Sequence, residues 1–417
     1  MIRAIASDNF PPFGKFVLPL LPVEKKPAEL GEVHLFTGVN GTGKTRLLSM
    51  IAAMLGSNFA LLRRMKGFAS GATIYATDAC PAPDNLGLWS QMDARSGSVN
   101  WVRFYGNFGN ELQTIPAFAY CGNAYVSDAK ISVLANVQRP NRHECLSFSH
   151  PETTSQSLLQ AIANLITASA LPADESSNTA GKTDPKDLVN SMESTISGIT
   201  RVPFQFHITR FPEISLDVRW GGKQLPFDLL PDGLRSIIGW MAHALVMVEI
   251  WLQGGRDPRG SEAIFLLDEP ESHLHPAWQR KILPAFQHLF PKAQIFVATH
   301  SPFVIASVNH GWIHPITLDS DGKAKIEKSI SASSGESYVS VVEDVMGLKE
   351  WFDPETEDLL AKFRKARDEA YQGSASSQSL ARKLAAEISG RSVELEFMMG
   401  RELIQMDRQL TKQAAPK

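Results

Sequence analysis

The sequence is poor in cysteine, nearly balanced in charge and without a long apolar run. Its 417 residues contain three cysteines, too few for a disulfide framework; they suit a reducing compartment, so we expect the protein in the cytoplasm. Lysine and arginine total 41 against 44 aspartates and glutamates, and this net charge of -3 gives no global attraction for nucleic acid or an anionic membrane. The N-terminus lacks an apolar run followed by a small-residue cleavage site, which argues against a signal peptide.

One uncharged and mostly apolar run, residues 236–248, could in principle belong to a transmembrane helix. The run is shorter than the about 20 residues that a transmembrane helix needs, and Arg235 and Glu249 bound it. Runs of this length are more often core helices of folded domains. We therefore predict a buried helix here and no membrane partner.

The composition is that of an ordinary folded globular protein, and the order of the predicted elements indicates an α/β fold. Apolar residues make up 43% and charged residues 20%, and the length allows two or three domains at roughly 100–200 residues each. Residues 1–36 have the pattern of short strands, which predicts an antiparallel N-terminal β part. From Gly233 onward, helical patterns alternate with the apolar runs 263–269 and 293–300, which predicts a mostly parallel sheet. Beyond about residue 336 we predict two or three amphipathic helices.

A glycine-rich loop lies between a predicted strand and a predicted helix. Its sequence, GVNGTGKT at residues 38–45, matches G-x-x-x-x-G-K-[ST] at every fixed position. Glycines let backbone N–H groups turn toward phosphate oxygens, and a helix N-terminus adds donors and partial positive charge. Lys44 is predicted to reach the β- and γ-phosphates of a nucleotide, and Thr45 to offer its hydroxyl to Mg²⁺. The expected nucleotide-binding residues of this loop are Gly38, Asn40, Gly41, Thr42, Gly43, Lys44, Thr45 and Arg46.

Two later predicted strands end in polar residues suited to the same chemistry. The first ends in Asp268 and Glu269, and carboxylates at the carboxyl end of a parallel strand face the crevice where ligands bind. We predict that Asp268 holds Mg²⁺ directly or through water, and that Glu269 polarises the attacking water as general base. The second strand ends at His300, which we expect to hydrogen-bond the γ-phosphate or that water. Lys44, Glu269 and His300 are therefore the expected catalytic residues.

In this order, GVNGTGKT, LLDEPESHLHP and VATHSP resemble the motifs of ABC-type ATPase heads of the SMC, RecF and OLD kind, which many bacterial anti-phage ATPases share. The resemblance is close over roughly residues 30–50 and 225–305, and the HLHP form is typical of the soluble, non-transporter branch. It implies ATP and Mg²⁺ as cofactors, and a homodimer or higher homo-oligomer in which paired heads bury two nucleotides as a sandwich. It also implies an ATPase domain at 1–335, with an insertion at about 60–225, and a helical region for partner or dimer contacts at 336–417.

Such heads receive a signature motif from the partner head, and the candidate here is LLPDGLRS at residues 229–236. Gly233 would present backbone N–H groups to the partner's γ-phosphate from a helix N-terminus. Pro231 stands where the family has serine, so Asp232 is expected to cap the helix and Arg235 to supply the missing positive contact. The alternative is an ordinary turn capping a core helix, which would fit a nucleotide-binding scaffold with little hydrolysis.

Two other polar clusters contain histidine or cysteine. Neither the pair His273 and His275 nor Cys145 with its flanking histidines supplies the four ligands of structural zinc. The resemblance instead places the pair in the loop that crosses the dimer interface. The glutamine loop of such heads is expected near residues 121–123, although its glutamine cannot be assigned.

The C-terminal part of the chain bears on whether a nuclease lies in this chain or in a separate partner protein. The segment LDSDGKAK predicts a hairpin, and the helical tail leaves no room for a Toprim nuclease block, so we predict no nuclease in this chain. The tail resembles that of ATPases paired with an HNH nuclease in Septu-type and retron-associated defence systems. The leading hypothesis is thus an ATPase subunit that controls a separate nuclease, with nucleic acid bound through the complex. A RecF- or SMC-like repair ATPase and a transporter ATPase are the alternatives.

Overall fold

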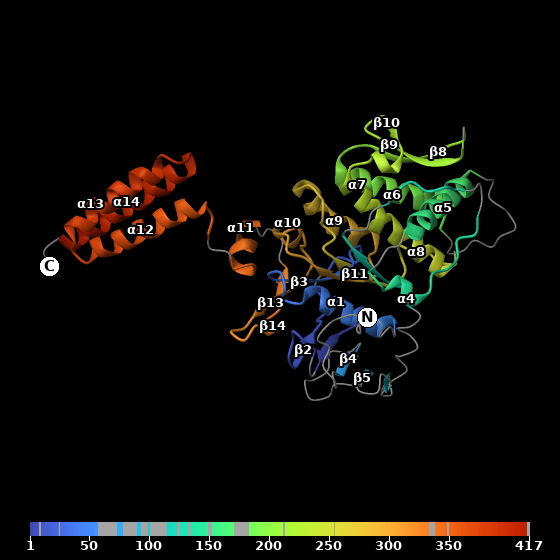
Figure 1. The fold of residues 1–417 in the computed structure, drawn as a ribbon, viewed down its shortest axis with the longest axis horizontal. Helices are drawn as coiled ribbons and strands as arrows, with labels where there is room; N and C mark the ends of the chain where they lie inside the picture. Colours follow the sequence, from blue (N-terminus) through green and yellow to red (C-terminus); the bar gives the residue numbers. More distant parts are fainter. Residues whose placement is uncertain are drawn as a thin grey trace. The chain divides into compact units, whose positions relative to one another are not determined.

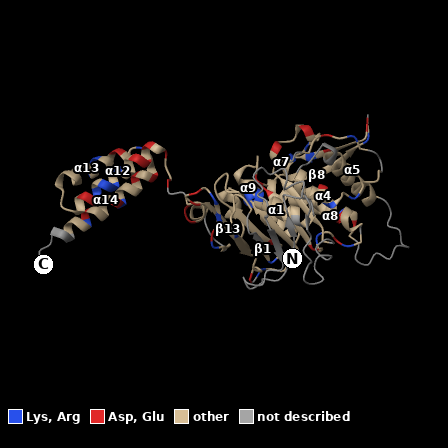
Figure 2. Cartoon of the chain, turned by 60° about the horizontal axis from the view of Figure 1, so that its bottom comes forward, with Lys and Arg blue, Asp and Glu red and all other residues tan. Residues whose placement is uncertain are grey.

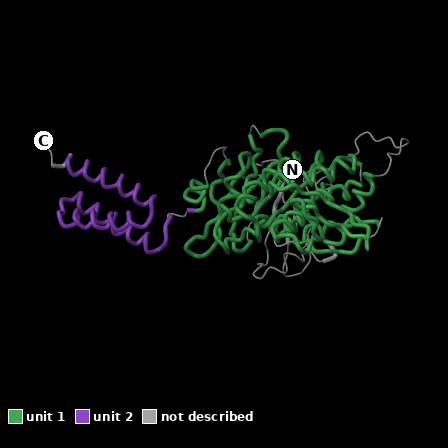
Figure 3. The backbone as a smooth tube through the Cα atoms, turned by 90° about the horizontal axis from the view of Figure 1, so that it is seen from above, with its two compact units in different colours: residues 1–346 green, residues 347–417 purple. Residues whose placement is uncertain are grey.

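The computed structural model describes residues 1–417 apart from 8–9, 25, 57–72, 78–89, 93–98, 101–114, 123–125, 132–134, 149–151, 171–182, 212, 254, 333–337, 348–349 and 415–417. The chain forms two compact units, residues 1–346 and 347–417, coloured green and purple in Figure 3. The second unit begins at Gly347 rather than at the predicted residue 336. The reason is that Val341, in the intervening segment, is buried in the apolar core of the first unit.

The first unit is built on a seven-stranded sheet in the order β14-β13-β3-β12-β11-β7, with β15 beside β13 (Figure 1). Neighbouring strands from β13 to β7 are parallel, whereas β14 and β15 run antiparallel to β13. All residues of β3, β11 and β12 are buried, as is usual for parallel strands covered on both faces. The predicted mostly parallel sheet is confirmed. The strands are β3 (Glu32–Thr37), β7 (Ala117–Cys121), β11 (Ala263–Asp268), β12 (Ala293–Ala298), β13 (Gly311–Leu318), β14 (Ala324–Ile326) and β15 (Ile330–Ala332).

Successive residues of the central strands face two separate apolar cores. On β11, Phe265 packs in the larger core, which the helices of the second half of the unit complete. Its neighbour Leu266 packs in the smaller core, together with α1 and the N-terminal strands. The sheet is therefore covered on both faces. The covering helices are α1 (Lys44–Gly56), α5 (Glu152–Ser169), α6 (Pro185–Thr200), α7 (Asp232–Ile237), α8 (His243–Leu252) and α9 (Pro276–Leu289).

A second, antiparallel sheet in the order β2-β1-β4-β5-β6 confirms the predicted N-terminal β part. Its strands are β1 (Ala4–Ser7), β2 (Phe16–Pro19), β4 (Thr73–Thr77), β5 (Ser90–Met92) and β6 (Val99–Asn100). β4 and β7 come from the segment 60–225 that the sequence marks as an insertion, yet they pair with β1 and β11. This segment therefore completes both sheets. It also forms a small antiparallel sheet of β8 (Phe204–Thr209), β9 (Ser215–Trp220) and β10 (Lys223–Leu225). The run WVRFYG at residues 101–106, for which the sequence also predicts a short strand, lies outside the described residues.

The apolar run 236–248 is part of one long helix. Helices α7 and α8 continue into each other through a single π-helical segment, Ile238–Ala242. Within the described residues, Asp232–Leu252 is the one helix long and apolar enough to cross a membrane, and 83% of its apolar window is buried inside the protein. The helix packs in the larger core beside Phe286 of α9, and the predicted buried helix is confirmed.

The second unit is a bundle of three helices, α12 (Pro354–Tyr371), α13 (Ala375–Ser389) and α14 (Val393–Ala414). Leu360 and Phe363 of α12, Ile388 of α13 and Met399 of α14 lie in a common apolar core. Basic and acidic residues alternate along the ribbons of these helices (Figure 2). The short helices α10 (Pro302–Ile305) and α11 (Tyr338–Ser340) belong to the first unit.

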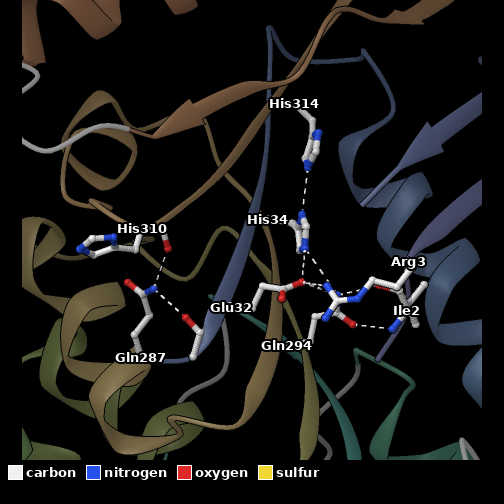
Figure 4. Close-up of polar contacts among 9 residues, drawn as sticks. Ile2, Arg3, Glu32, His34, Gln287, Gln294, His310 and His314 are labelled. Atoms are coloured by element: carbon white, nitrogen blue, oxygen red, sulfur yellow. Dashed lines mark hydrogen bonds and ion pairs between the residues drawn. The ribbon is translucent and has the colours of Figure 1, made fainter. Parts of the chain in front are cut away.

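A chain of buried polar side chains crosses β3 and β13 (Figure 4). The hydroxyl of Ser329 donates to Nδ1 of His314, 2.7 Å away, and Nε2 of His314 lies 3.1 Å from Nδ1 of His34. Nε2 of His34 lies 2.9 Å from the Glu32 carboxylate, which also accepts from Arg3 at 2.5 Å. Each contact is satisfied, with both imidazoles neutral, when Ser329 donates to His314, His314 to His34 and His34 to Glu32.

Gln294 of β12 ties this chain to the N-terminus. Its amide nitrogen donates to Glu32 and to the carbonyl of Ile2, and its oxygen accepts from the Ile2 N–H. Burial raises the pKa of Glu32, but hydrogen bonds from His34 and Arg3 outweigh it, so the net shift is downward. Burial lowers the pKa values of His34 and His314, which keeps both rings neutral at neutral pH.

The buried histidines predict a loss of stability in mild acid. Because their pKa values are lower in the folded than in the unfolded state, the unfolded chain takes up protons first as the pH falls. The contribution of the two histidines is full above about pH 6.5 and falls below it by at most roughly 1.4 kcal/mol per pH unit for each histidine. Buried Asp268 and Glu271, whose pKa values are raised to about 6 and about 7, contribute in the opposite direction, so the histidine contribution is read from the difference between wild type and a histidine variant. Urea unfolding of the first unit, followed by tryptophan fluorescence, measures this slope. His314→Gln should reduce the slope, whereas His288→Gln, at an exposed histidine, should leave it unchanged; equal slopes in all three proteins would contradict the assignment.

Candidate functional site

The glycine-rich loop of residues 38–43, called the phosphate-type loop below, connects the end of β3 to the start of α1, as its motif predicts. Gly38, Gly41 and Gly43 have φ values of 150°, 86° and 93°, which residues with a Cβ rarely adopt. A Cβ on Gly38 would also lie 2.2 Å from the carbonyl oxygen of Ile316 on β13. The first glycine of the motif is thus required by close approach to a neighbouring strand as well as by its backbone conformation.

The side chain of Lys44 lies inside this loop. Its Nζ donates to the carbonyls of Gly38 and Val39, at 2.7 and 3.0 Å, and Thr42 Oγ1 donates to Val39 at 2.9 Å. The residue is 6% exposed. Burial lowers the pKa of Lys44, although Glu269 and Asp268 partly oppose the shift. A cation held by neutral carbonyls in a nearly enclosed loop is well placed to exchange them for an anionic ligand.

Asp268 and Thr45 meet at the carboxyl edge of the sheet. Thr45 Oγ1 donates to Asp268 Oδ1 over 2.9 Å, although the two residues are 223 positions apart. Burial raises the pKa of Asp268 to about 6, against the hydrogen bond from Thr45, which lowers it. A buried carboxylate beside a hydroxyl is a donor set suited to a hard divalent cation such as Mg²⁺. Bound cation would favour the ionised form of Asp268.

The parallel register brings the second strand to the same edge. Asp268 of β11 is level with Ala298 of β12, which is level with Phe36 at the end of β3. Residues following these positions therefore converge. Nε2 of His300 lies 3.4 Å from Oε1 of Glu269, and both side chains are more than one-third exposed. Glu269 has φ of 50°, and its N–H donates to the carbonyl of Ala298, so the strained backbone is held by the neighbouring strand.

A further carboxylate, Glu271, was not singled out from the sequence. Its side chain is buried and accepts a short hydrogen bond from Thr299 Oγ1, in the residue before His300. Its other oxygen has no hydrogen-bond partner among the described residues. Burial raises the pKa of Glu271 to about 7. Glu271 positions the segment that carries His300, and its place two residues after Glu269 in DEPES was the available signal.

Gly122, at the end of β7, connects the site to the α7 helix. Its N–H donates to the carbonyl of Asp268, and its own carbonyl accepts from Ser236 Oγ at 3.0 Å. A Cβ on Gly122 would lie 1.8 Å from the carbonyl oxygen of Glu269, so only glycine fits. The residue lies within the region expected for the glutamine loop, residues 121–123; Asn123 itself is outside the described residues.

The signature candidate surrounds the start of α7. A Cβ on Gly233 would lie 2.9 Å from the carbonyl oxygen of His273, so this glycine permits close packing against the loop before α9. Arg235 donates from Nε to the carbonyl of Val126 and lies 3.5 Å from Asp228. The expectation that Asp232 caps the helix is wrong. Pro231 occupies the N-cap position without a side-chain cap hydrogen bond, and Asp232 is the first helical residue, where its charge favours the positive end of the helix dipole.

The other predicted residues lie as follows. Asn40 and Gly41 are exposed at the tip of the phosphate-type loop, and the guanidinium of Arg46 lies 6.0 Å from the ring centre of Phe10. His275 caps α9, because its Nδ1 accepts from the N–H of Ala277. Together, the ammonium of Lys44, the hydroxyl of Thr45 and the carboxylate of Asp268 fit the phosphates and Mg²⁺ of a nucleotide.

Comparison with known proteins agrees with this chemistry. Residues 115–306, from β7 to α10, match the family described as "AAA domain, putative AbiEii toxin, Type IV TA system". The chain is 28% identical over 178 residues to a Septu protein PtuA of Bacillus thuringiensis, an alignment covering 41% of this chain and 45% of that protein. It is also 28% identical over 123 residues to a protein of Vibrio cholerae named "Retron Vc95 probable ATPase", covering 30% of this chain and 23% of the relative.

The chain thus spans less than half the length of these two relatives in the aligned regions. The resemblance to ATPases of Septu-type and retron-associated systems is confirmed. Among solved structures, an SMC head bound to a winged-helix domain of ScpA aligns over 79% of this chain and 97% of its own, with a TM-score of 0.47 and 13% identity.

Proposed function

We propose that this chain is an ATP-hydrolysing subunit of a bacterial anti-phage complex and acts in the cytoplasm. The observation that carries the proposal is the convergence of Lys44, Thr45, Asp268, Glu269 and His300 at one edge of the sheet. These five residues come from three strand ends that the parallel register holds level. Each has the side chain that phosphate binding, cation binding or water activation requires.

In the proposed mechanism, the backbone N–H groups of the phosphate-type loop and Lys44 hold the β- and γ-phosphates. Thr45 and Asp268 hold Mg²⁺, which when bound neutralises charge on the phosphate oxygens. Glu269 accepts a proton from the attacking water, and His300, with Nε2 3.4 Å from that carboxylate, holds the γ-phosphate or the water in place. Glu271 keeps Thr299 fixed beside His300.

We further propose that two heads close on two nucleotides, each head completing the site of the other. The N-terminus of α7 supports this, because Gly233 brings backbone N–H groups to a helix start that no side chain caps. Leu229, just before this helix, is 68% exposed and is therefore accessible to a second head. Arg235, in the first turn of α7, carries a positive charge here, with its guanidinium 3.5 Å from Asp228 and 3.8 Å from Asp232.

Leu229→Asp tests the paired arrangement. This change adds a charge to the exposed surface of the signature candidate (residues 229–236), called the signature surface below, and leaves the phosphate-type loop of the same chain intact. We expect ATP binding to persist, while ATP hydrolysis and ATP-dependent dimerisation, followed by phosphate release and light scattering, fall about tenfold or more.

A complementation experiment provides the control. Lys44→Ala disables the phosphate-type loop but keeps the signature surface, whereas Leu229→Asp does the reverse. Co-expressed, the two variants should form one intact composite site per mixed dimer and recover hydrolysis that neither has alone. If Leu229→Asp hydrolyses ATP at the wild-type rate, or if the mixture stays inactive, the sandwich arrangement is contradicted.

The proposed role in defence is nuclease control. Relatives named for Septu and retron systems support this role. The separate helical unit at residues 347–417 also supports it, because we propose that this unit binds an HNH-type nuclease. In this division of labour the purified chain leaves plasmid DNA intact with ATP and Mg²⁺ present. Cleavage by the chain alone would contradict it, and strong stimulation of ATP hydrolysis by duplex DNA would favour a repair ATPase instead.

A further inference from the structure

Helix α14 exposes an apolar stripe that its own bundle does not use. Val393, Phe397 and Ile404 are 70%, 74% and 55% exposed, although each is a large apolar residue. With the exposed Gly400 they recur at intervals of four, three and four residues, which places all four on one face of the helix. This spacing is that of the contact positions of a two-helix coiled coil.

A different face of α14 already serves the bundle. Leu395, Met399 and Met406 are buried against α12 and α13. The stripe therefore adds nothing to the folding of the unit, and three exposed large side chains on one face are a liability for a chain in water unless another surface covers them.

We propose that this stripe pairs with the α14 stripe of a second copy of the chain, with the two helices antiparallel about a twofold axis. One register makes the stripe self-complementary. It places Phe397 opposite Gly400 of the partner subunit and Val393 opposite Ile404 of the partner subunit, and the twofold repeats both contacts. A Cβ on Gly400 would meet no atom within 4 Å, so the Phe397 ring finds open space there.

The charges beside the stripe agree with the same register. Glu394 and Arg401, both exposed, follow Val393 and Gly400 directly in sequence. In an antiparallel pair with this register, Glu394 lies near Arg401 of the partner subunit, and the twofold repeats the ion pair on the other side. A parallel pair would set glycine against glycine and phenylalanine against phenylalanine, leaving one layer empty and the next crowded. Complementarity of size and charge therefore favours the antiparallel second copy.

The proposed contact differs from the head contact in needing no nucleotide. Three large apolar side chains from each subunit and two exposed ion pairs per dimer form a small interface, so we expect a dissociation constant on the order of 10 µM in the absence of ATP. Such a contact would hold subunits together between rounds of head closure and raise the effective concentration of one head for another.

Sedimentation velocity of the full chain without nucleotide, up to about 100 µM, tests this pairing. Wild type should form dimers, and Phe397→Glu should weaken them at least about tenfold. Leu380→Glu, at a 49% exposed leucine of α13, is the matched control and should dimerise normally. Phe397 is exposed, so its replacement should leave the helix content measured by circular dichroism unchanged.

Charge reversal tests the register. Glu394→Arg and Arg401→Glu should each weaken the dimer, and the double variant should restore it. A wild-type chain that stays monomeric at the highest concentration, or dimers insensitive to Phe397→Glu, would overturn the inference. So would binding of the wild type but not Phe397→Glu to phosphatidylglycerol vesicles without any dimer, because the stripe would then serve a membrane surface. None of these readouts depends on ATP, so failure here leaves the proposed ATPase function standing.

Discussion

Lys44→Ala is expected to weaken nucleotide binding, with a loss of affinity of roughly 10² to 10³-fold for ATP and for a non-hydrolysable analogue. The ammonium is the positive charge enclosed by the loop, where burial strengthens its attraction for phosphate. Isothermal titration with the analogue measures the change directly. Hydrolysis should fall with binding, because phosphates that are not held cannot be presented to Glu269.

The variant also removes a donor from two loop carbonyls, so a structural control is needed. Lys281 offers a matched one, since its Nζ donates to the carbonyls of Gly198 and Ile199 at 2.9 and 3.1 Å, away from the phosphate-type loop. Lys281→Ala should keep full ATP affinity. If Lys44→Ala binds the analogue within a few-fold of wild type, the loop is not the phosphate site, and the proposed function is wrong at its first step.

Glu269→Gln is expected to slow ATP hydrolysis by about 10² to 10⁴-fold while ATP binding persists. Glutamine keeps the size and the hydrogen-bonding oxygen of the side chain but cannot accept the proton of the attacking water. The strained φ of Glu269 and its N–H bond to Ala298 are backbone features, so the substitution leaves the position of the side chain intact. Single-turnover phosphate release separates this chemical step from binding.

The neighbouring carboxylate supplies the control for Glu269→Gln. Glu271→Gln retains the oxygen that accepts from Thr299, and the pKa of about 7 means that Glu271 is already partly protonated near neutral pH. Its turnover should stay within a few-fold of wild type. Accumulation of an ATP-bound dimer by Glu269→Gln alone would support the sandwich. Wild-type hydrolysis by Glu269→Gln would instead remove Glu269 from the mechanism.

The sequence predicted the contiguous parts of the site well. Residues 38–43 form a loop between a strand and a helix because all three of its glycines adopt positive φ, and the whole motif is read within eight neighbouring positions. The strands ending at Asp268 and Ala298 were also predicted, since long apolar runs between helices indicate parallel strands. The roles of Lys44 and Glu269 in ATP chemistry stay predictions, which Lys44→Ala and Glu269→Gln test.

Other features depended on contacts between distant residues. The segment 60–225 was predicted as an insertion, because its short, mixed patterns give no sign that β7 pairs with β11. Asp232 was expected to cap α7 because Asp-Gly is a common helix start, yet the helix begins at Asp232 itself with Pro231 before it. Whether a residue is the N-cap or the first residue of a helix depends on a shift of one position, which the sequence pattern does not resolve.

By itself, the sequence determined which chemical groups are available: a glycine loop for phosphate, a hydroxyl and a carboxylate for a cation, and an acid and a histidine for water. These are local properties, encoded in residue type and spacing. Only the tertiary structure decided that Thr45 meets Asp268, that Thr299 meets Glu271, and that α12 and α13 leave the Phe397 stripe of α14 uncovered. Burial, pKa and exposure depend on residues far apart in the chain, so they follow from the packing of the sheet and helices and not from any single motif.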